Sequence, residues 1–286
     1  MASMRIDHCL AAALAVVLAV GPALAQAPAG GEAPDPINAA PTPRDWAAIG
    51  QLPDLSGVWT PGPMDKFLPG TDTAPVWTAE KAAEIAALKQ LDKEGRPQNI
   101  YTNCLPEGLP SSVTQTLNSL ELLVTPGRVT MLGEFDGNRL RRIWTDGRKH
   151  PEDPDPTFSG HSIGHWDKNT LVIDTIGFLP QVFIPLSQGV GLPNNGDMHV
   201  EERITLVDAD TLRWDITVHA PRVLARPWTS TRSFSRHRER SFDPIESSCR
   251  QGDFFDEVDA RGNAIYTPIP KDAGGAPVPP DQPTAP

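Results

Sequence analysis

Two histidines, His161 and His165, stand in the run SGHSIGHWDKNTLVIDT, which spans residues 159–175. Residues 160–164 also spell G-x-S-x-G, the nucleophile elbow of serine hydrolases, which works only where a strand turns sharply into a helix. Here a loop rich in Pro and Asp precedes the motif, and alternating β-branched residues follow it. The context predicts a β-hairpin. The sequence therefore argues against a serine nucleophile and places both histidines on one strand.

Asp174 interrupts the apolar run of the second strand of this hairpin. With a two-residue turn at Lys168-Asn169, Asp174 lies opposite Ile163 and falls between the two histidines. In that position Asp174 could orient an imidazole or hold a metal ion. The alternative is that Asp174 is a hydrogen-bonded side chain at the edge of the sheet without a functional role. The His-x-x-x-His spacing on a strand separates the rings by roughly 13 Å, so we expect no metal site from this pair. His161 and Asp174 are candidate catalytic residues.

A second hairpin, over residues 198–219, carries further ionisable side chains around Asp208-Ala209-Asp210. If these three residues form the loop, Val207 faces Thr211 and His199 faces His219. In this register the apolar residues of both strands share one face of the hairpin, which supports the pairing.

The polar face of this hairpin has two possible surroundings. If it meets solvent, Arg203 and Asp215 form an ordinary surface pair across the strands. If it lines a wet cavity, His199, His219 and Glu201 cluster in a pocket. The second alternative predicts catalytic roles for His199 and Arg203 and substrate contact for His219.

Glu202 stands on the apolar face of the same hairpin, between Val200 and Ile204. A carboxylate in that position is either buried with a partner or lies at a rim, because an isolated buried charge is costly. A buried, protonated Glu202 could serve as a general acid. Trp166 and Trp228 are candidate aromatic walls of a substrate pocket, although Trp228 fits a core anchor equally well.

The remaining pattern indicates an all-β domain. Short β-type runs separated by turn residues recur from residue 55 to residue 238, and one helix is clearly indicated, capped by Thr78 and ended by Gly95. Antiparallel hairpins with one helix near the N-terminal part predict a β-barrel or a curved sandwich. The early Gly57-x-Trp59 is similar to a motif of lipocalin-like (calycin) barrels.

The segment 179–197 is expected to be a long loop whose end, 189–197, resembles a mobile lid.

Residues 1–25 resemble a secretory signal peptide, with Arg5, an apolar stretch and the cleavage site Ala23-Leu24-Ala25. This stretch is too short to span a bilayer, so we expect a periplasmic or secreted protein without membrane insertion. Residues 26–50 and 271–286 are rich in Ala, Pro or Gly and are expected to be disordered. A single barrel-like domain is expected between them, over residues 51–270.

Cys104 and Cys249 remain after the expected signal peptide. An exported compartment and an even count favour a disulfide, worth on the order of 4–5 kcal/mol in the chain-entropy account; two buried free thiols are the alternative. No C-x-x-C, P-loop, Rossmann glycine motif or H-E-x-x-H occurs, so we expect no nucleotide or zinc cofactor. The net charge of -11 argues against a nucleic-acid partner.

Six segments together resemble a large family of exported bacterial proteins, most of them described only as hypothetical. They are DLSGVW at 54–59, CLPEGLP at 104–110, FSGHSIGHW at 158–166, TLVIDTIGF at 170–178, HVEER at 199–203 and RPW at 226–228. Members usually carry an acidic residue and Gly after the Trp, where this chain has Asp167-Lys168. The resemblance implies a β-barrel-like domain, and it names no reaction.

These features favour an exported enzyme that acts on a small organic molecule by cofactor-free general acid–base chemistry, as a lyase, isomerase or hydrolase. An imidazole would move the proton, a carboxylate would orient it or act as partner acid, and Arg203 would hold a substrate oxyanion. The candidate catalytic residues are His161, Asp174, His199, Glu202 and Arg203. The alternatives are a non-catalytic lipocalin-like protein that binds a small hydrophobic ligand, and a structural envelope protein.

Overall fold

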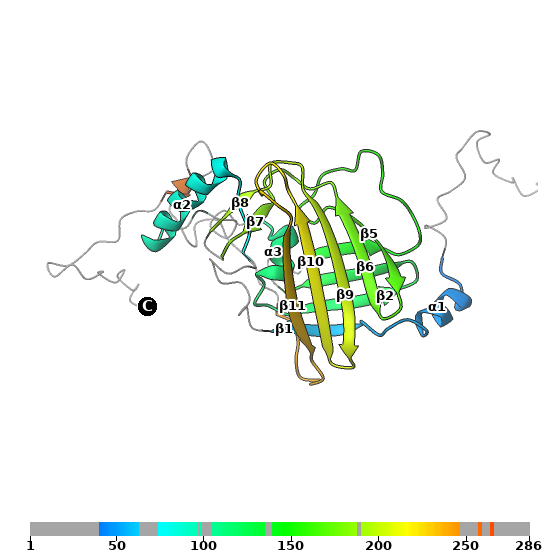
Figure 1. Cartoon of the computed structure of the whole chain (residues 1–286). Helices are drawn as coiled ribbons and strands as arrows, with labels where there is room; N and C mark the ends of the chain where they lie inside the picture. Colours follow the sequence, from blue (N-terminus) through cyan, green and yellow to red (C-terminus); the bar gives the residue numbers. More distant parts are fainter. Residues whose placement is uncertain are drawn as a thin grey trace, which may run out of the picture. The chain divides into compact units, whose positions relative to one another are not determined.

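The computed structural model describes residues 40–62, 74–96, 98, 105–134, 139–187, 190–245, 257–258 and 264–265. Within these residues, nine strands close into a barrel in the order β1-β11-β10-β9-β6-β5-β4-β3-β2 (Figure 1). They are β1 (Gly57–Pro61), β2 (Leu120–Thr125), β3 (Arg128–Gly133), β4 (Leu140–Trp144), β5 (His161–Asp167), β6 (Thr170–Ile176), β9 (His199–Asp208), β10 (Thr211–His219) and β11 (Trp228–Arg236). The predicted all-β barrel is confirmed.

The ring contains one parallel pair of neighbours, β4 and β5, and its other pairs are antiparallel. Strand direction alternates between antiparallel neighbours, and such alternation cannot close around an odd number of strands. The parallel pair is therefore a requirement of closure. It is short, with the partners Ile143↔Ser162 and Trp144↔Ile163. A parallel pair also needs a crossover connection, and residues 145–160 provide it.

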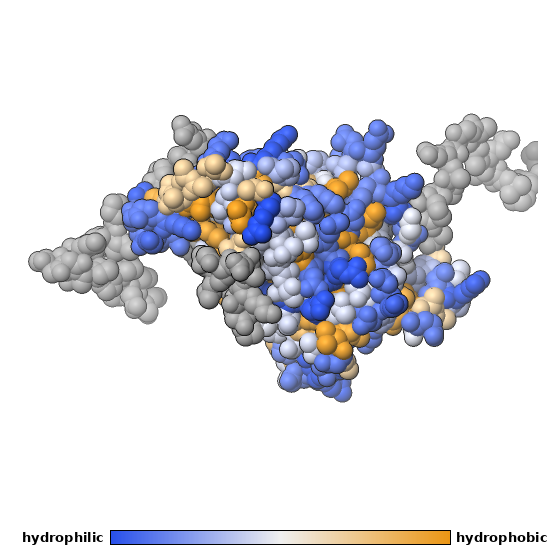
Figure 2. Space-filling view, in the orientation of Figure 1, coloured by the Kyte–Doolittle hydropathy of each residue, from blue (hydrophilic) through white to orange (hydrophobic). Residues whose placement is uncertain are grey.

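Large apolar side chains fill the inside of the barrel. Trp59, Trp214 and Phe234 are fully buried, and the indole Nε1 of Trp59 donates a hydrogen bond to the Leu55 carbonyl at 2.9 Å. The short helix α3 (Gly108–Thr114) adds apolar side chains to the same core and packs against β10 and β11. The outer surface in view is mostly hydrophilic with scattered apolar side chains (Figure 2). The apolar face of each strand is thus the inner face.

The predicted helix is α2 (Ala79–Lys93). The Thr78 hydroxyl accepts from the Lys81 amide, and Gly95 follows the helix with a positive φ of 72°. Ile85 packs in a small second core with side chains of a two-stranded sheet region, β7 (Phe183–Pro185) and β8 (Gly191–Pro193). A capped start and a glycine end are the signals that made this helix predictable.

The segment 179–197 is better ordered than predicted. It carries β7 and β8, and the Asn194 side-chain amide donates to the carbonyls of Leu179, Pro180 and Val182 at 2.8–3.2 Å. Asn194 is fully buried. The expected mobile lid at 189–197 is therefore wrong for the described residues, because buried side chains and hydrogen bonds hold them.

Another helix, α1 (Pro43–Ile49), lies within the segment 26–50 that was expected to be disordered. Thr42 and Asp45 form a reciprocal capping box at its start, and Pro43 occupies the first helical position.

The strands β12 (Glu257–Val258) and β13 (Ala264–Ile265) pair with each other. The expected signal peptide, Cys104 and Cys249 lie outside the described residues.

Both hairpins have the predicted register, with one difference at a turn. Asp174 lies opposite Ile163, and His199 lies opposite His219. Thr211 pairs with Asp208 instead of Val207, because a β-bulge shifts the register beside the turn. No helix among the described residues is long and apolar enough to cross a membrane.

Gly160 provides a test of the close packing at the start of β5. Its φ is +67°, and a Cβ there would lie 2.7 Å from the Ile176 carbonyl oxygen. Gly147 has a φ of +84° but nothing within 4 Å of the corresponding Cβ. We predict that Gly160→Ala lowers the free energy of unfolding by about 1–3 kcal/mol more than Gly147→Ala does, because only the first adds a backbone clash to the strain. Urea denaturation measures both; equal losses would contradict this packing.

Candidate functional site

Four histidines and two acids gather on the outside of the barrel. They lie on β5, β6, β9, β10 and the crossover 145–160, and we call them the histidine cluster: His150, His161, Asp174, His199, Glu201 and His219. Their strand neighbours Ser162, Thr175 and Val200 are buried inside. Because side chains alternate across a strand, the cluster residues of the strands point outward.

The cluster is joined by a continuous series of contacts. The Nδ1 atoms of His150 and His161 are 2.8 Å apart, and His150 Nε2 lies 3.3 Å from Asp174 Oδ2. The other carboxylate oxygen, Asp174 Oδ1, contacts His199 Nε2. His199 stacks on His219, with ring centroids 5.4 Å apart, and His219 Nε2 lies 3.1 Å from Glu201 Oε2. Asp174 thus connects two pairs of imidazoles.

These contacts fit one arrangement of the protons, with an ionised Asp174 and a neutral His150. An ionised carboxylate is an acceptor only, so Asp174 accepts from the Nε2–H of His150. The Nδ1 of neutral His150 is then an acceptor, and His161 donates its Nδ1–H to it. The remaining ring nitrogen of His161, Nε2, carries a lone pair and no proton. In this arrangement His161 has a proton on Nδ1 and none on Nε2, the tautomer that a general base needs.

The surroundings of His161 also keep it neutral. Burial lowers the pKa of its imidazole, and the nearby His150 and Arg148 side chains lower it further. An imidazole ordinarily titrates near 6.5. A lowered pKa means that His161 is unprotonated at neutral pH, which is the form that accepts a proton.

His150 was not identified from the sequence. It lies in the crossover 145–160, where no strand or helix periodicity marks a face. The crossover is held against the barrel by Thr157, whose amide donates to the Gly177 carbonyl at 3.0 Å, and by Pro154, which packs against Gly177. The need for a parallel connection brings His150 beside the predicted residues.

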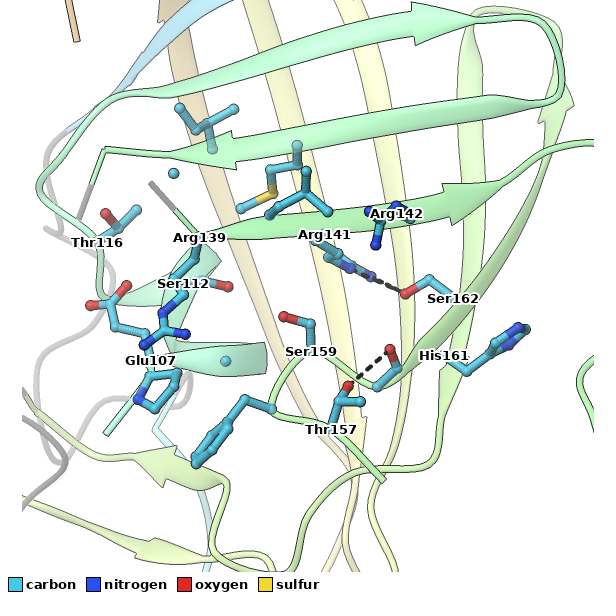
Figure 3. Close-up of a pocket in the computed structure, with 18 of the residues that line it drawn as sticks. Glu107, Ser112, Thr116, Arg139, Arg141, Arg142, Thr157, Ser159, His161 and Ser162 are labelled. Carbon is cyan, nitrogen blue, oxygen red and sulfur yellow. Dashed lines mark hydrogen bonds between the residues drawn. The ribbon is translucent and has the colours of Figure 1, made fainter. Parts of the chain in front are cut away.

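A cavity of about 450 Å³ opens at the seam between β4 and β5 (Figure 3). Because β5 begins at His161, the first residues of β4 have no partner on that side. Apolar and polar side chains share the lining: Met131, Leu140, Trp144 and Phe158, with Glu107, Arg139, Arg141, Arg142, Ser159, His161 and Ser162. In Figure 3 the His161 ring lies at the edge of this group and points away from it. His161 therefore belongs both to the cavity rim and to the histidine cluster.

Inside the wall, Arg141 and Glu202 form a buried ion pair. Arg141 Nη1 donates to Glu202 Oε1 at 3.0 Å, and the Trp214 indole donates to the same oxygen at 3.0 Å. Arg141 also donates to the hydroxyls of Ser162 and Thr175 at 3.1–3.2 Å. Arg141 is 4% exposed and Glu202 1%. Glu202 is thus a paired carboxylate on the inner face, which corrects its predicted place in a catalytic group with the histidines.

The structure separates other predicted site residues from the cluster. Arg203 is exposed on the outer face of β9, but its ion-pair partner is Asp167, with Nη2 3.3 Å from Oδ2, whereas the expected partner Asp215 pairs with Arg213. Trp228 is buried in the main core, and Trp166 packs against that core. The polar face of the hairpin 198–219 is therefore the outside of the barrel, and the prediction that it lines an internal cavity is wrong.

No group of three His, Cys, Asp or Glu side chains is arranged to hold a metal ion in the described part of the chain. The two ring nitrogens of His150, for example, are directed to two different residues, His161 and Asp174. What the cluster presents is a hydrogen-bonded network of imidazoles and carboxylates.

No protein-family model matches the sequence, and no curated protein matches it at a significant level. The geometry of the side chains is therefore what bears on function.

The buried pair can be tested by removing its cation. We predict that Arg141→Met lowers the free energy of unfolding by about 3–5 kcal/mol, because Glu202 then remains buried without a compensating charge. Replacing both partners, with Arg141→Met and Glu202→Leu, should recover most of the loss. Arg142→Met, at the next residue and on the exposed side, should change stability by about 0.5 kcal/mol or less. Chemical denaturation of the three variants decides: similar losses for Arg141→Met and Arg142→Met would refute the pairing.

Proposed function

We propose that the protein is an enzyme that acts on a small organic molecule by general acid–base chemistry, with His161 as the base. The observation that carries this proposal is the series of contacts His161–His150–Asp174, made by a residue that also lines a cavity. A base that is oriented by a second group, which is in turn fixed by a carboxylate, is a recurring arrangement in proton-transfer enzymes.

The proposed reaction begins when His161 Nε2 takes a proton from the part of a bound substrate that extends past the cavity rim to the outer face, or from a water molecule beside it. The imidazolium that forms can keep its Nδ1–H hydrogen bond to His150, which in turn contacts Asp174. Return of the proton to another atom gives an isomerisation, loss of a leaving group gives an elimination, and activation of water gives a hydrolysis. His199, which shares Asp174 with His150, is our candidate for the partner acid.

We also propose that the protein works in the periplasm or outside the cell, in line with the signal-like segment 1–25 and with the resemblance to exported bacterial proteins. A Cys104–Cys249 disulfide belongs to the same proposal, since an oxidising compartment favours it.

A second candidate function is ligand binding without chemistry at the same cavity. The side chains of Trp144, Phe158 and Met131 support it, because aromatic and apolar linings are usual in small-molecule sites. The barrel interior does not support it, since large side chains fill that space. The two functions differ in what His161 does: binding alone does not need an unprotonated Nε2.

The pKa of His161 gives a test that needs no substrate. We expect its imidazole to titrate below 6.5 in an NMR titration, and Arg148→Gln to raise its pKa, because one cation is removed. Activity that requires neutral His161 should then fall as the pH drops through this pKa. Folding favours the neutral form, so this group should also reduce stability as the pH falls below the unfolded-state value near 6.5. A pKa at or above 6.5 would contradict the proposed environment.

A substrate screen tests the activity itself, with aromatic and terpenoid metabolites and the purified protein. We predict that His161→Gln lowers turnover by about 10²–10⁴-fold, the usual contribution of a general base. His165→Gln is the matched control: His165 is exposed on the same face of the same strand, and we expect it to leave turnover unchanged. Full turnover by His161→Gln would end the proposal.

A further inference from the structure

We infer that the small molecule bound at the seam cavity carries a carboxylate, and that Arg142 binds it beside His161. This inference rests on the proposed function, since it names the substrate class of the same site.

The register places Arg142 and His161 side by side. β4 and β5 run parallel, with the partners Ile143↔Ser162 and Trp144↔Ile163. Arg142 and His161 each immediately precede the first of these pairs, so they lie opposite each other just before the paired part of the two strands. Ile143 and Ser162 are buried inside, so their neighbours Arg142 and His161 both point outward. Both line the cavity, and Figure 3 shows them on either side of Ser162.

Arg142 differs from the other arginines near the seam. Arg141 is neutralised by Glu202, and Arg148 lies 3.1 Å from Asp146 Oδ2. Arg142 is exposed and has no acidic partner among the described residues. In a chain of net charge -11, the Arg142 guanidinium is an exposed cation at a cavity that Arg139 and Glu107 also line. A single guanidinium matches a carboxylate in charge and in its planar, two-pronged geometry.

The rest of the cavity suits the body of such a molecule. Trp144 and Phe158 provide aromatic surfaces, and the volume of about 450 Å³ suits a small ligand. Arg148, which is paired with Asp146, covers Trp144, with its Cζ 3.8 Å from the ring centroid. A carboxylate held by Arg142 would therefore position an apolar body in the cavity and its reacting atom near His161.

Calorimetric titration with two probes of the same shape tests the inference on the full chain. The probes are 3-phenylpropanoate and its neutral amide, 3-phenylpropanamide. We expect the carboxylate to bind at least about tenfold more tightly than the amide, because a charge-assisted bidentate contact is lost in the amide. Arg142→Gln should abolish this preference. Arg213→Gln, at an exposed arginine of β10 that pairs with Asp215, should retain it.

The outcomes separate this inference from the proposed function. His161→Gln should keep the preference for the carboxylate, since His161 makes no ion pair with it, while losing turnover. A carboxylate preference that depends on Arg142 in a protein without any turnover would end the proposed enzyme and leave the binding site. Equal binding of the two probes, no binding of either, or an unchanged preference in Arg142→Gln would overturn the inference. Tighter binding of inorganic phosphate than of the carboxylate would overturn it too.

Discussion

Closure of an odd number of strands is the constraint on which the rest of this structure depends. Nine strands cannot alternate in direction all the way around a ring, so one neighbouring pair, β4 and β5, must run parallel. A parallel pair needs a crossover, and the crossover carries His150 to His161 and Asp174. The pairing of β4 with β5 is short, and the unpaired start of β4 leaves the seam at which the cavity lies. The topology thus produces both the proton network and the place beside it for a ligand.

Ionisable groups have opposite roles on the two sides of the barrel wall. On the inner face, Arg141 of β4 reaches Ser162 of β5, Thr175 of β6 and Glu202 of β9, so one guanidinium connects four strands across the seam. Its partners satisfy it, which is what a buried charge requires. On the outer face, the histidine cluster connects β5, β6, β9 and β10 through side chains that are partly exposed to solvent. We interpret the inner pair as the frame that fixes the strands, and the outer network as the part that moves protons.

The sequence predicted the strands of the barrel and, apart from the partner of Thr211, the partners across both hairpins, because a period of two and turn residues determine both. It therefore predicted that Asp174 lies opposite Ile163 and His199 opposite His219. The pattern alone left open which face of the hairpin 198–219 looks inward. The structure has the solvent-facing alternative for the polar face, because the apolar face fills the barrel. His150 could not be predicted, since a loop residue has no period. Arg141 could have been: it shares the inward face of Ile143, and an opposite charge, Glu202, interrupts another apolar face.

A filled barrel restricts where proton chemistry can take place. A general base must exchange its proton with substrate and then with solvent, and a fully buried imidazole among Trp59, Trp214 and Phe234 could do neither. The rim of the seam satisfies both needs, because His161 is buried enough to remain neutral and still borders a cavity. Asp174 adds a further restriction. Its two carboxylate oxygens contact different imidazoles, Oδ2 that of His150 and Oδ1 that of His199. Asp174 therefore fixes the position of the imidazole that contacts His161 and that of the imidazole that stacks on His219, so the two halves of the network cannot be placed independently.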